Sequence, residues 1–239
     1  MTAHLRPTAP IAADVLLPGD PALALALAQA LLDRPLMANH SHGLWGYSGR
    51  TATGRELTIQ ATGIGGPSAA VVLAELAGHG ARRAIRLGLC SALEPRLAVG
   101  CVVVAAAALA ADGASRALSD EAPEPEPGLT AALASAARAR PVTVVSYDLL
   151  HDPDRTQRRD RWLAEGAVVA DLESAAVLAV GARHGLACAA ALVVAEDADG
   201  GDDEQATELG LIRLGEAAAE ALGAAPKAQA AGSERSRSL

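Results

Sequence analysis

The sequence contains no phenylalanine, and aromatic residues account for only 2% of its 239 positions. A hydrophobic core must therefore be packed mainly with aliphatic side chains, and the abundance of alanine and leucine favours helices. The three cysteines, Cys90, Cys101 and Cys188, match no metal-ligand spacing and leave one thiol over in any disulfide scheme. Such cysteine usage is typical of a reducing compartment, so we expect a cytoplasmic protein.

The sequence also lacks an excess of positive charge and a long apolar run. Its formal net charge is −8 at pH 7, which argues against nucleic acid or a phospholipid surface as the main partner. No apolar run reaches the roughly 20 residues of a membrane helix without a charge or a glycine. The first residues show no signal-peptide pattern. We therefore expect a protein that binds neither nucleic acid nor membrane.

The most informative segment begins with a short strand and a glycine-rich turn. Leu57–Ala61 has the composition of a strand, and Thr62–Gly66 is too rich in glycine for regular structure. Pro67 then stands where the first turn of a helix tolerates a missing N–H. From Ser68 the apolar residues fit one face of a helix that ends near Gly78–Gly80. A glycine turn that leads into a helix N-terminus supplies free N–H groups for an anion.

A second strand, Ala84–Leu87, follows and runs directly into Gly88. It contains Arg86, and an arginine inside a buried sheet is costly unless an anion pairs with it. Open α/β sheets bind ligands at the carboxyl ends of their strands, so Arg86 and the preceding glycine turn indicate a phosphate or carboxylate site there. The structural alternative is that Arg86 pairs with an internal carboxylate such as Glu75.

The glycine turn also imitates a dinucleotide-binding motif. Residues 63–68 read GIGGPS, which loosely matches G-x-G-x-x-G. That motif requires an acidic residue about 20 positions further on to hold a ribose hydroxyl, and the next strand instead contains Arg86. The sequence therefore disfavours dinucleotide binding.

Strands and helices alternate along the rest of the chain. A strand at Val15–Leu17 leads through the turn Pro18–Pro21 into a helix at Ala22–Leu32. The other expected strands are 102–104, 142–146, 168–170 and 188–195, and the other expected helices are 129–138, 174–184 and 209–222. The expected irregular segments are a polar connection at 39–49, a turn at 112–115 and an acidic loop at 119–128, and the charged residues 155–161 are expected to form a solvated helix face.

This alternation predicts a single α/β domain with a central mixed β-sheet flanked by helices. The content of 51% hydrophobic and 20% charged residues is sufficient for one substantial core. The domain is expected to span residues 1–225, and residues 226–239 are expected to form a disordered C-terminal tail.

The order of several short motifs resembles one family, the purine nucleoside and uridine phosphorylases of the hexameric bacterial type. The matching motifs run from about residue 4 to residue 222: LPGDP (17–21), GYSG (46–49), TGIGGPS (62–68), IRLGLCSAL (85–93), VGCVVV (99–104), DGAS (112–115), DLESAA (171–176) and LVVAED (192–197). The resemblance implies a phosphorylase/hydrolase-like fold and a homo-oligomer built from dimers, hexameric in the family. The DGAS and GIGGPS motifs are closer to the uridine branch, and the sequence leaves the base and the sugar open.

In that family, phosphate attacks the anomeric carbon of a nucleoside and releases the free base and (deoxy)ribose 1-phosphate. The resemblance therefore implies a pentosyltransferase that uses inorganic phosphate as co-substrate and needs no cofactor or metal. It assigns phosphate binding to Gly19 and Arg86. It assigns nucleoside binding to His4, reaching a neighbouring subunit's ribose 5′-hydroxyl, to Leu172 beneath the sugar, and to Glu173 at the 2′- and 3′-hydroxyls.

The acid that protonates the departing base corresponds to Glu196, and a one-residue slip would select its neighbour Asp197. Side chains alternate across a strand, so only one of the two acids is expected to face the cleft. The alternatives for the other assigned residues are structural: Glu173 could serve only as a favourable helix start, His4 could belong to a mobile terminus, and both acids could be solvated.

The chain departs from the family pattern at several ligand positions. Leu23 stands in place of a second phosphate arginine, and His42 in place of a third arginine that the adjacent subunit lends. Leu89 replaces a hydroxyl residue that touches phosphate, and Leu150 lies where the family has an aromatic residue against the base. Three hypotheses follow: a divergent nucleoside phosphorylase, a nucleoside hydrolase that uses water, or a non-catalytic descendant that binds a nucleoside.

Overall fold

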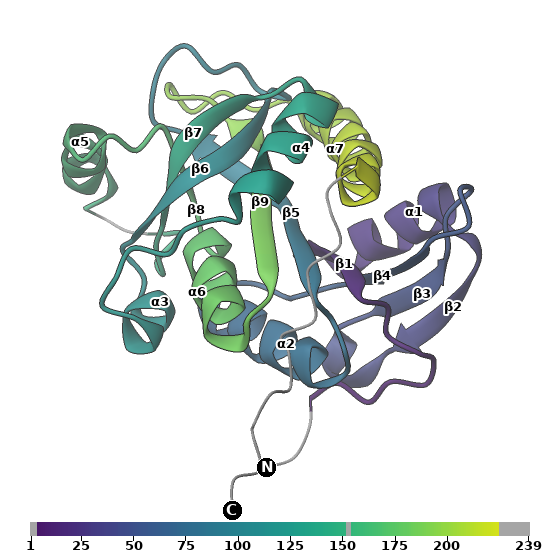
Figure 1. Cartoon of the computed structure of the whole chain (residues 1–239). Coiled ribbons are helices and arrows are strands. Elements are labelled where there is room, and N and C mark those ends of the chain that lie inside the picture. The colour runs from purple at the N-terminus through teal and green to yellow at the C-terminus, as the bar shows by residue number, and fades with distance from the viewer. Residues whose placement is uncertain (1–3, 152–153, 225–239) are drawn as a thin grey trace, which may run out of the picture.

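The computed structural model describes residues 4–151 and 154–224, so the expected tail at 226–239 lies outside the described residues. A nine-stranded mixed sheet runs through the molecule in the order β2-β3-β4-β1-β5-β8-β7-β6-β9, with β5 also paired to β9 (Figure 1). The strands are β1 (Asp14–Pro18), β2 (Asp33–Asn39), β3 (Gly46–Arg50), β4 (Glu56–Gln60), β5 (Arg83–Ala92), β6 (Val102–Ala110), β7 (Arg140–Ser146), β8 (Val169–Asp171) and β9 (Ala187–Glu196).

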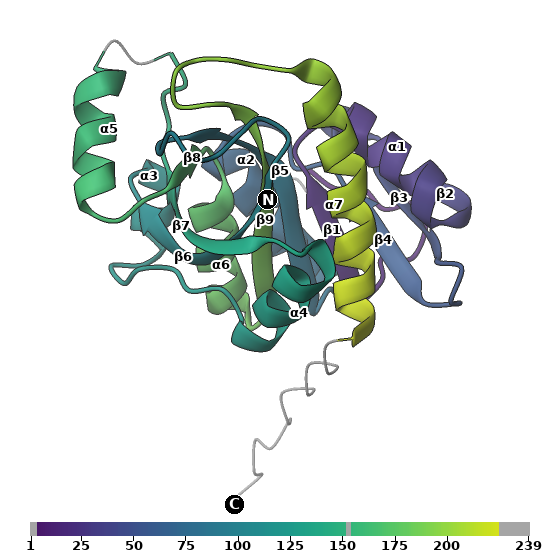
Figure 2. The same cartoon turned by 90° about the horizontal axis from the view of Figure 1, so that it is seen from above.

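Seven α-helices and one short 3₁₀ helix, η1 (Ser41–Gly43), connect these strands within the described residues. The α-helices are α1 (Pro21–Leu31), α2 (Gly66–Gly78), α3 (Gly113–Leu118), α4 (Pro127–Ala137), α5 (Arg155–Ala164), α6 (Ser174–His184) and α7 (Glu204–Ala224) (Figure 2). The expectation of one α/β domain with a mixed sheet flanked by helices is confirmed. No described helix is both long and apolar enough to cross a membrane.

Five of the strands close into a ring. β5 pairs in parallel with β9 along most of its length and antiparallel with β8 at its end. β9 continues the ring to β6, β6 to β7, and β7 back to β8. β1, β4, β3 and β2 extend from β5 as an open arm. β5 therefore belongs to both parts of the sheet: its first half pairs with β1 of the arm, and its carboxyl end pairs with β8 of the ring.

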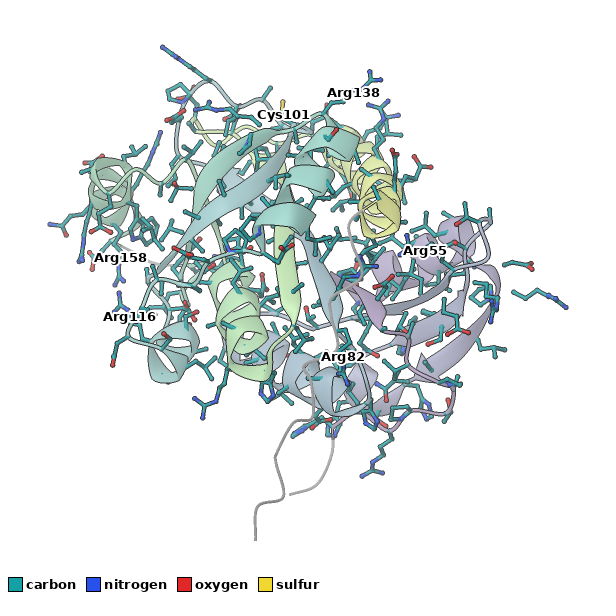
Figure 3. All side chains as sticks on the ribbon, viewed as in Figure 1. Arg55, Arg82, Cys101, Arg116, Arg138 and Arg158 are labelled. Atoms are coloured by element: carbon teal, nitrogen blue, oxygen red, sulfur yellow. The ribbon has the colours of Figure 1, made fainter. Side chains whose placement is uncertain are left out.

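Charged side chains lie mainly on the outside of this framework. Arg82, Arg116, Arg138 and Arg158 are exposed, and Figure 3 shows Arg116, Arg138 and Arg158 around the periphery of the molecule. One buried exception is Arg83, which donates two hydrogen bonds, each of 2.7 Å, to the carboxylate of the partly buried Asp14. This ion pair lies at the amino ends of β1 and β5, the edge of the sheet where these strands begin.

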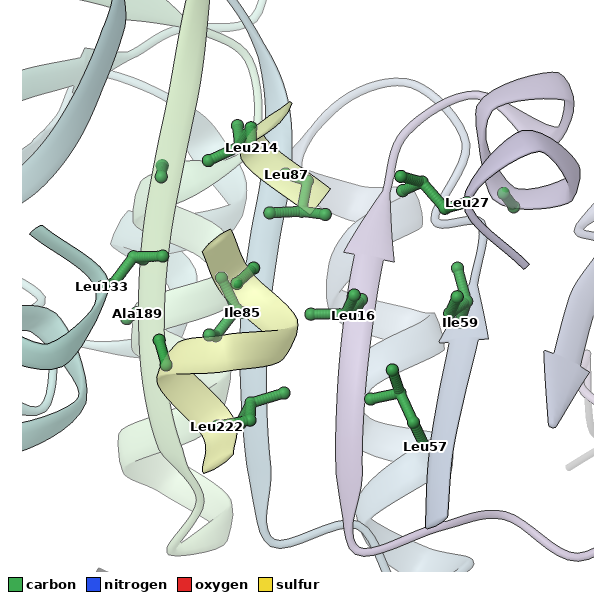
Figure 4. Close-up of a cluster of buried hydrophobic side chains, with 14 of the residues drawn as sticks. Leu16, Leu27, Leu57, Ile59, Ile85, Leu87, Leu133, Ala189, Leu214 and Leu222 are labelled. Atoms are coloured by element: carbon green, nitrogen blue, oxygen red, sulfur yellow. The ribbon is translucent and has the colours of Figure 1, made fainter. Parts of the chain in front are cut away.

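Two apolar clusters cover the two faces of the sheet. Alternation along β1 sends Leu16 to one face and its neighbours Val15 and Leu17 to the other. The Leu16 face packs against α1, α4 and α7 through Ile85, Leu87 and other side chains (Figure 4). The opposite face packs against α2 and α6 through Val72, Leu73, Leu76 and Val177. Because Ile85 and Leu87 point toward α7, Arg86 between them points to the other face.

Three expectations about local structure were wrong. The segment 39–49, expected as a connection, contains η1 and the start of β3, and the strand β2 before it was not expected. β2 lacks a clear alternating pattern because only its last two residues are buried. Residues 112–115 begin the helix α3, since the Asp112 carboxylate accepts a hydrogen bond from the Ser115 N–H and caps it.

The third difference concerns α7, which begins at Glu204 and not at Leu209. The Asp203 carboxylate accepts a hydrogen bond from the Ala206 N–H at 3.0 Å, as a helix N-cap does. The expected start followed the first large apolar residue and overlooked this cap.

Candidate active site

A cavity of about 550 Å³ opens at the carboxyl ends of β1, β5 and β9. Its volume lies within the range of roughly 300–1,000 Å³ that is usual for small-molecule sites. The residues that line it are Gly19, Asp20, Pro21, Leu23, Gly63, Ile64, Arg86, Gly88, Leu89, Cys90, Ser91, Tyr147, Leu150, Ala170, Asp171, Leu172, Glu173, Ala195, Glu196 and Leu211. The structure thus brings together Gly19, Arg86, Leu150, Leu172, Glu173 and Glu196 from the sequence assignments.

Arg86 forms the buried floor of the cavity and is 2% exposed. Its Nη2 donates a short hydrogen bond to Glu173 Oε2 and lies 3.7 Å from Asp171 Oδ2, while Nη1 donates to the Leu87 carbonyl at 2.8 Å. Its Nε is buried without a hydrogen-bond partner among the described residues. The guanidinium folds back over its own strand and lies directly above Gly88. A Cβ at Gly88 would be only 2.4 Å from Nη2. Gly88 is therefore required for this conformation.

Glu173 connects Arg86 to the glycine turn before α2. Its Oε2 accepts from Arg86, and its Oε1 accepts a 2.8 Å hydrogen bond from the Gly65 N–H. It occupies the N-cap position of α6, yet its side chain makes no capping hydrogen bond there. The carboxylate thus points into the cavity and does not cap the helix that follows it.

Asp171 performs the capping that Glu173 does not, a role that the sequence assignments missed. Its carboxylate accepts hydrogen bonds from the Ser174 N–H at 3.0 Å and from the Ser146 and Ser174 hydroxyls. Burial raises the pKa of Asp171, Arg86 opposes this effect, and Glu173 adds to it. The sequence did contain a signal for this role. Asp171 stands three positions before Ser174, and an aspartate in this position can cap a helix by accepting a hydrogen bond from the N–H three residues later.

Two glycine turns meet beside Arg86. The Gly63 N–H donates to the Gly19 carbonyl at 3.0 Å, so the turns after β1 and β4 are bonded to each other. A Cβ at Gly19 would lie 3.8 Å from Arg86 Nη1. Gly63 has a φ of 73°, and a Cβ there would lie 2.7 Å from the Ser68 hydroxyl. The Gly19 turn therefore brings main chain close to the guanidinium, and the Gly63 turn is bonded to it.

The remainder of the lining is mostly apolar or acidic, with the hydroxyl groups of Ser91 and Tyr147 as neutral polar members. Among the described residues that line the cavity, Arg86 is the only arginine or lysine, and four carry carboxyl groups: Asp20, Asp171, Glu173 and Glu196. Leucines occupy the positions at 23, 89, 150, 172 and 211, and Leu89 and Leu150 remain 44% and 49% exposed. The cavity therefore combines one buried cation with an apolar mouth.

Glu196 and Asp197 are placed differently. The Glu196 carboxylate accepts a 2.8 Å hydrogen bond from the Ser91 hydroxyl in the cavity wall. Asp197 Oδ1 accepts from the main-chain N–H groups of Asp199 and Gly201, at 2.9 and 2.8 Å. Asp197 thus organises the loop after β9, and it does not line the main cavity.

His4 and His42 lie together outside this cavity. Their rings are 5.1 Å apart, and neither residue lines the cavity of its own chain. His4 bonds through its N–H and its Nδ1 to Glu75 Oε1, at 3.0 and 3.1 Å. Burial would raise the pKa of Glu75, but the hydrogen bonds from His4 and Leu5 lower it overall. Glu75 therefore pairs with His4. Arg86 does pair with an internal carboxylate, as the structural alternative expected, but its partners are Glu173 and Asp171 and not the suggested Glu75.

The described residues contain no group of three or more His, Cys, Asp or Glu side chains that could hold a metal ion. The site is instead built from a buried arginine, glycine turns and carboxyl groups. The arginine and the glycine turns of such a site can bind an anion, and its carboxyl groups can accept hydrogen bonds from the hydroxyl groups of a ligand beside that anion.

Comparison with known proteins agrees with this geometry. The sequence model of one protein family, the phosphorylase superfamily, matches residues 14–228. The chain belongs to the phosphorylase superfamily. A DeoD-type purine nucleoside phosphorylase from Roseobacter denitrificans is 32% identical over 213 residues, which cover 84% of this chain and 90% of the relative. The resemblance to nucleoside phosphorylases is therefore confirmed.

A second relative within the superfamily carries a different substrate name. The uridine phosphorylase of Treponema pallidum is 32% identical over 197 residues, covering 75% of this chain and 76% of the relative. The crystal structure of uridine phosphorylase from Vibrio fischeri ES114 has the same fold, with a TM-score of 0.84 at 23% identity, covering 89% of this chain and 92% of that one. The superfamily members similar to this chain thus include both purine and uridine enzymes.

Proposed function

We propose that the protein is a nucleoside phosphorylase, a pentosyltransferase that uses inorganic phosphate to cleave the N-glycosidic bond of a nucleoside. The products are the free base and (deoxy)ribose 1-phosphate, and no cofactor takes part. The observation that carries the proposal is the buried Arg86, which lies against the Gly19 turn and pairs with Glu173. Membership of the phosphorylase superfamily and the names of the relatives support it.

Arg86 and Gly19 would bind the phosphate. A guanidinium binds phosphate through paired charge-assisted hydrogen bonds, and the buried Nε of Arg86 has a donor to spare. The main chain of the Gly19 turn lies against the same guanidinium. This arrangement would hold an anionic nucleophile in place, which is a large part of what such an enzyme must supply.

Glu173 would accept hydrogen bonds from the ribose 2′- and 3′-hydroxyls, with Leu172 beneath the sugar and Leu150 beside the base. Glu173 now shares its oxygens between Arg86 and the Gly65 N–H. Binding of phosphate to Arg86 would weaken that ion pair and release carboxylate oxygens for the sugar. Phosphate and nucleoside binding would therefore be coupled through one ion pair.

Glu196 would assist the departure of the base. It lines the cavity, and it lies with Ala195 at the end of β9. A carboxyl group that donates a proton or a hydrogen bond to the leaving base stabilises the charge that develops in the transition state. Asp197 would act indirectly, through the loop that it organises.

His4 and His42 would serve the cavity of a neighbouring subunit, which makes the active unit at least a dimer. The two rings lie together and outside the cavity of their own chain. The cavity holds one arginine against four carboxyl groups, so a phosphate dianion would gain from a further cation. A protonated His42 from the neighbouring subunit would supply it.

The test is incubation with a panel of purine and pyrimidine nucleosides, each with and without phosphate, followed by chromatography of free base and sugar phosphate. Base release that requires phosphate and yields sugar 1-phosphate supports the proposal. Equal release without phosphate would identify a hydrolase. Binding without cleavage of any nucleoside would identify a non-catalytic descendant.

A further inference from the structure

An irregularity in the pairing of β5 with β9 sets the direction of Glu196. The two strands pair one to one from Arg83 with Ala187 as far as Cys90 with Val194. The next pair is Ser91 with Glu196, so Ala195 is one extra residue on β9. A bulge of this kind bends its strand and re-aims the side chains beside it. Here it places Glu196 directly across from Ser91.

The Ser91 hydroxyl donates to Glu196 Oε2 at 2.8 Å. Both residues are partly buried, and both line the main cavity as well as an adjoining chamber of about 190 Å³. Ser91 and Glu196 therefore lie at the boundary between the two spaces. A ligand group at this boundary would meet the carboxyl group in the orientation that Ser91 gives it.

The main chain on both sides of this pair is also fixed. Arg159 of α5 donates from Nη2 to the Leu93 carbonyl and from Nη1 to the Ala198 carbonyl, each at 2.9 Å. Leu93 follows β5 and Ala198 follows β9, so Arg159 ties together the two strand ends that carry Ser91 and Glu196. The main chain that carries the Ser91–Glu196 contact is therefore held in place by Arg159.

We propose that Ser91 is a positioning residue that orients the Glu196 carboxyl group toward the base and lowers the pKa of that group. A hydroxyl donor stabilises a carboxylate more than a neutral carboxylic acid, so its hydrogen bond favours the ionised form. Ser91 thereby sets the upper pH limit for assistance to the leaving base. This inference rests on the proposed function, because it takes Glu196 as the acid.

Other titratable and charged groups share these two spaces with Glu196. They are Asp197, Asp199 and Arg159 in the adjoining chamber, Tyr147 in both spaces, and Asp20, Arg86, Cys90, Asp171 and Glu173 in the main cavity. Replacing Ser91 removes none of these groups, and it does not remove Asp202, whose main chain is bridged to that of Glu196. A change in the titration of Glu196 in a Ser91 variant therefore reports the lost hydroxyl.

The decisive experiment is NMR titration of the Glu196 carboxyl carbon in protein labelled at glutamate, with the signal assigned by its loss in Glu196→Gln. Ser91→Ala should raise the Glu196 pKa by about 0.5–1 unit. This shift corresponds to less free energy than a full hydrogen bond to a charged group contributes, because water partly replaces the hydroxyl. Ser91→Thr, which keeps the hydroxyl, should restore the wild-type value. Ser119→Ala, a serine outside both spaces, should leave the titration unchanged.

Kinetics give the second measurement. In Ser91→Ala, the alkaline limb of kcat/KM for purine nucleosides should move to higher pH by the same amount, and kcat should fall more than KM changes. An unchanged Glu196 titration in a folded Ser91→Ala protein overturns the inference, as does failure of Ser91→Thr to restore it. If Ser91→Ala does not fold, Ser91→Cys, a weaker donor of similar size, takes its place under the same criteria. A wild-type protein that cleaves no nucleoside refutes the proposed function, while the NMR titration still decides the role of Ser91.

Discussion

Replacement of Arg86 by alanine should reduce both the stability of the protein and its response to phosphate. The change leaves the carboxyl groups of Glu173 and Asp171, which are 6% and 3% exposed, without their cation. Removing one partner of a buried ion pair costs about 3–5 kcal/mol. That loss is within the roughly 5–15 kcal/mol by which domains are stable, so the variant should remain folded but weakened.

Phosphate separates the binding role of Arg86 from its structural role. A ligand at 100 times its dissociation constant stabilises the native state by about 2.7 kcal/mol. Wild-type protein should show this gain when phosphate is added to a urea titration followed by tryptophan fluorescence, whereas Arg86→Ala should show almost none. Arg82→Ala provides a matched control, because Arg82 is an exposed arginine whose side chain, among the described contacts, bonds only to the neighbouring Ala81 carbonyl.

A double-mutant cycle completes the measurement. Glu173→Ala removes the other side of the pair, and Arg86→Ala combined with Glu173→Ala should cost clearly less than the sum of the single changes. The reasoning fails if the two costs simply add. It also fails if Arg86→Ala retains the full phosphate gain, since the anion would then bind elsewhere.

Four further predictions follow from the site. Glu173→Ala should reduce the activity on ribosides by about two orders of magnitude or more, and an equal loss on 2′,3′-dideoxynucleosides would contradict its contact with the sugar hydroxyls. Glu196→Gln should lower purine nucleoside cleavage in steady-state assays far more than Asp197→Asn, and the reverse ranking would make Asp197 the acid. Because the pKa of Asp171 is raised in the folded protein, its contribution to stability is complete below about pH 4 and is lost as the pH rises through the folded-state pKa. Asp171→Asn should abolish that decline in urea titrations at a series of pH values, and a parallel pH dependence in both proteins would refute it. His42→Ala should raise the KM for phosphate, and sedimentation should show active protein as a dimer or larger; a fully active monomer would exclude a role for His42 across an interface.

Much of the fold could be predicted because its signals are local. The glycine turn before Pro67 and the arginine between Ile85 and Leu87 each follow from a few neighbouring residues. These signals located the cavity and its buried cation. β2 was missed because only its end is buried, so no alternating pattern marks it in the sequence.

The finer features of the site depend on pairs that are distant in sequence. Ser91 and Glu196 are 105 residues apart, and their contact follows from a bulge that one extra residue, Ala195, creates. The partner of Arg86 is 87 residues away, and the sequence suggested Glu75 in its place. Local composition carries no information about which of several carboxyl groups a buried guanidinium will meet.

The ion pair at the amino ends of β1 and β5 determines where the end of α7 lies. Arg83 and Arg55 both donate to the Leu222 carbonyl, at 2.8 and 2.5 Å, while also bonding to Asp14. The last turn of α7 is thereby fixed at the sheet edge opposite the one at which the cavity opens. An affinity tag or a surface anchor joined directly to the end of α7 would start from the far edge, so a protein immobilised there would keep its cavity facing the solution.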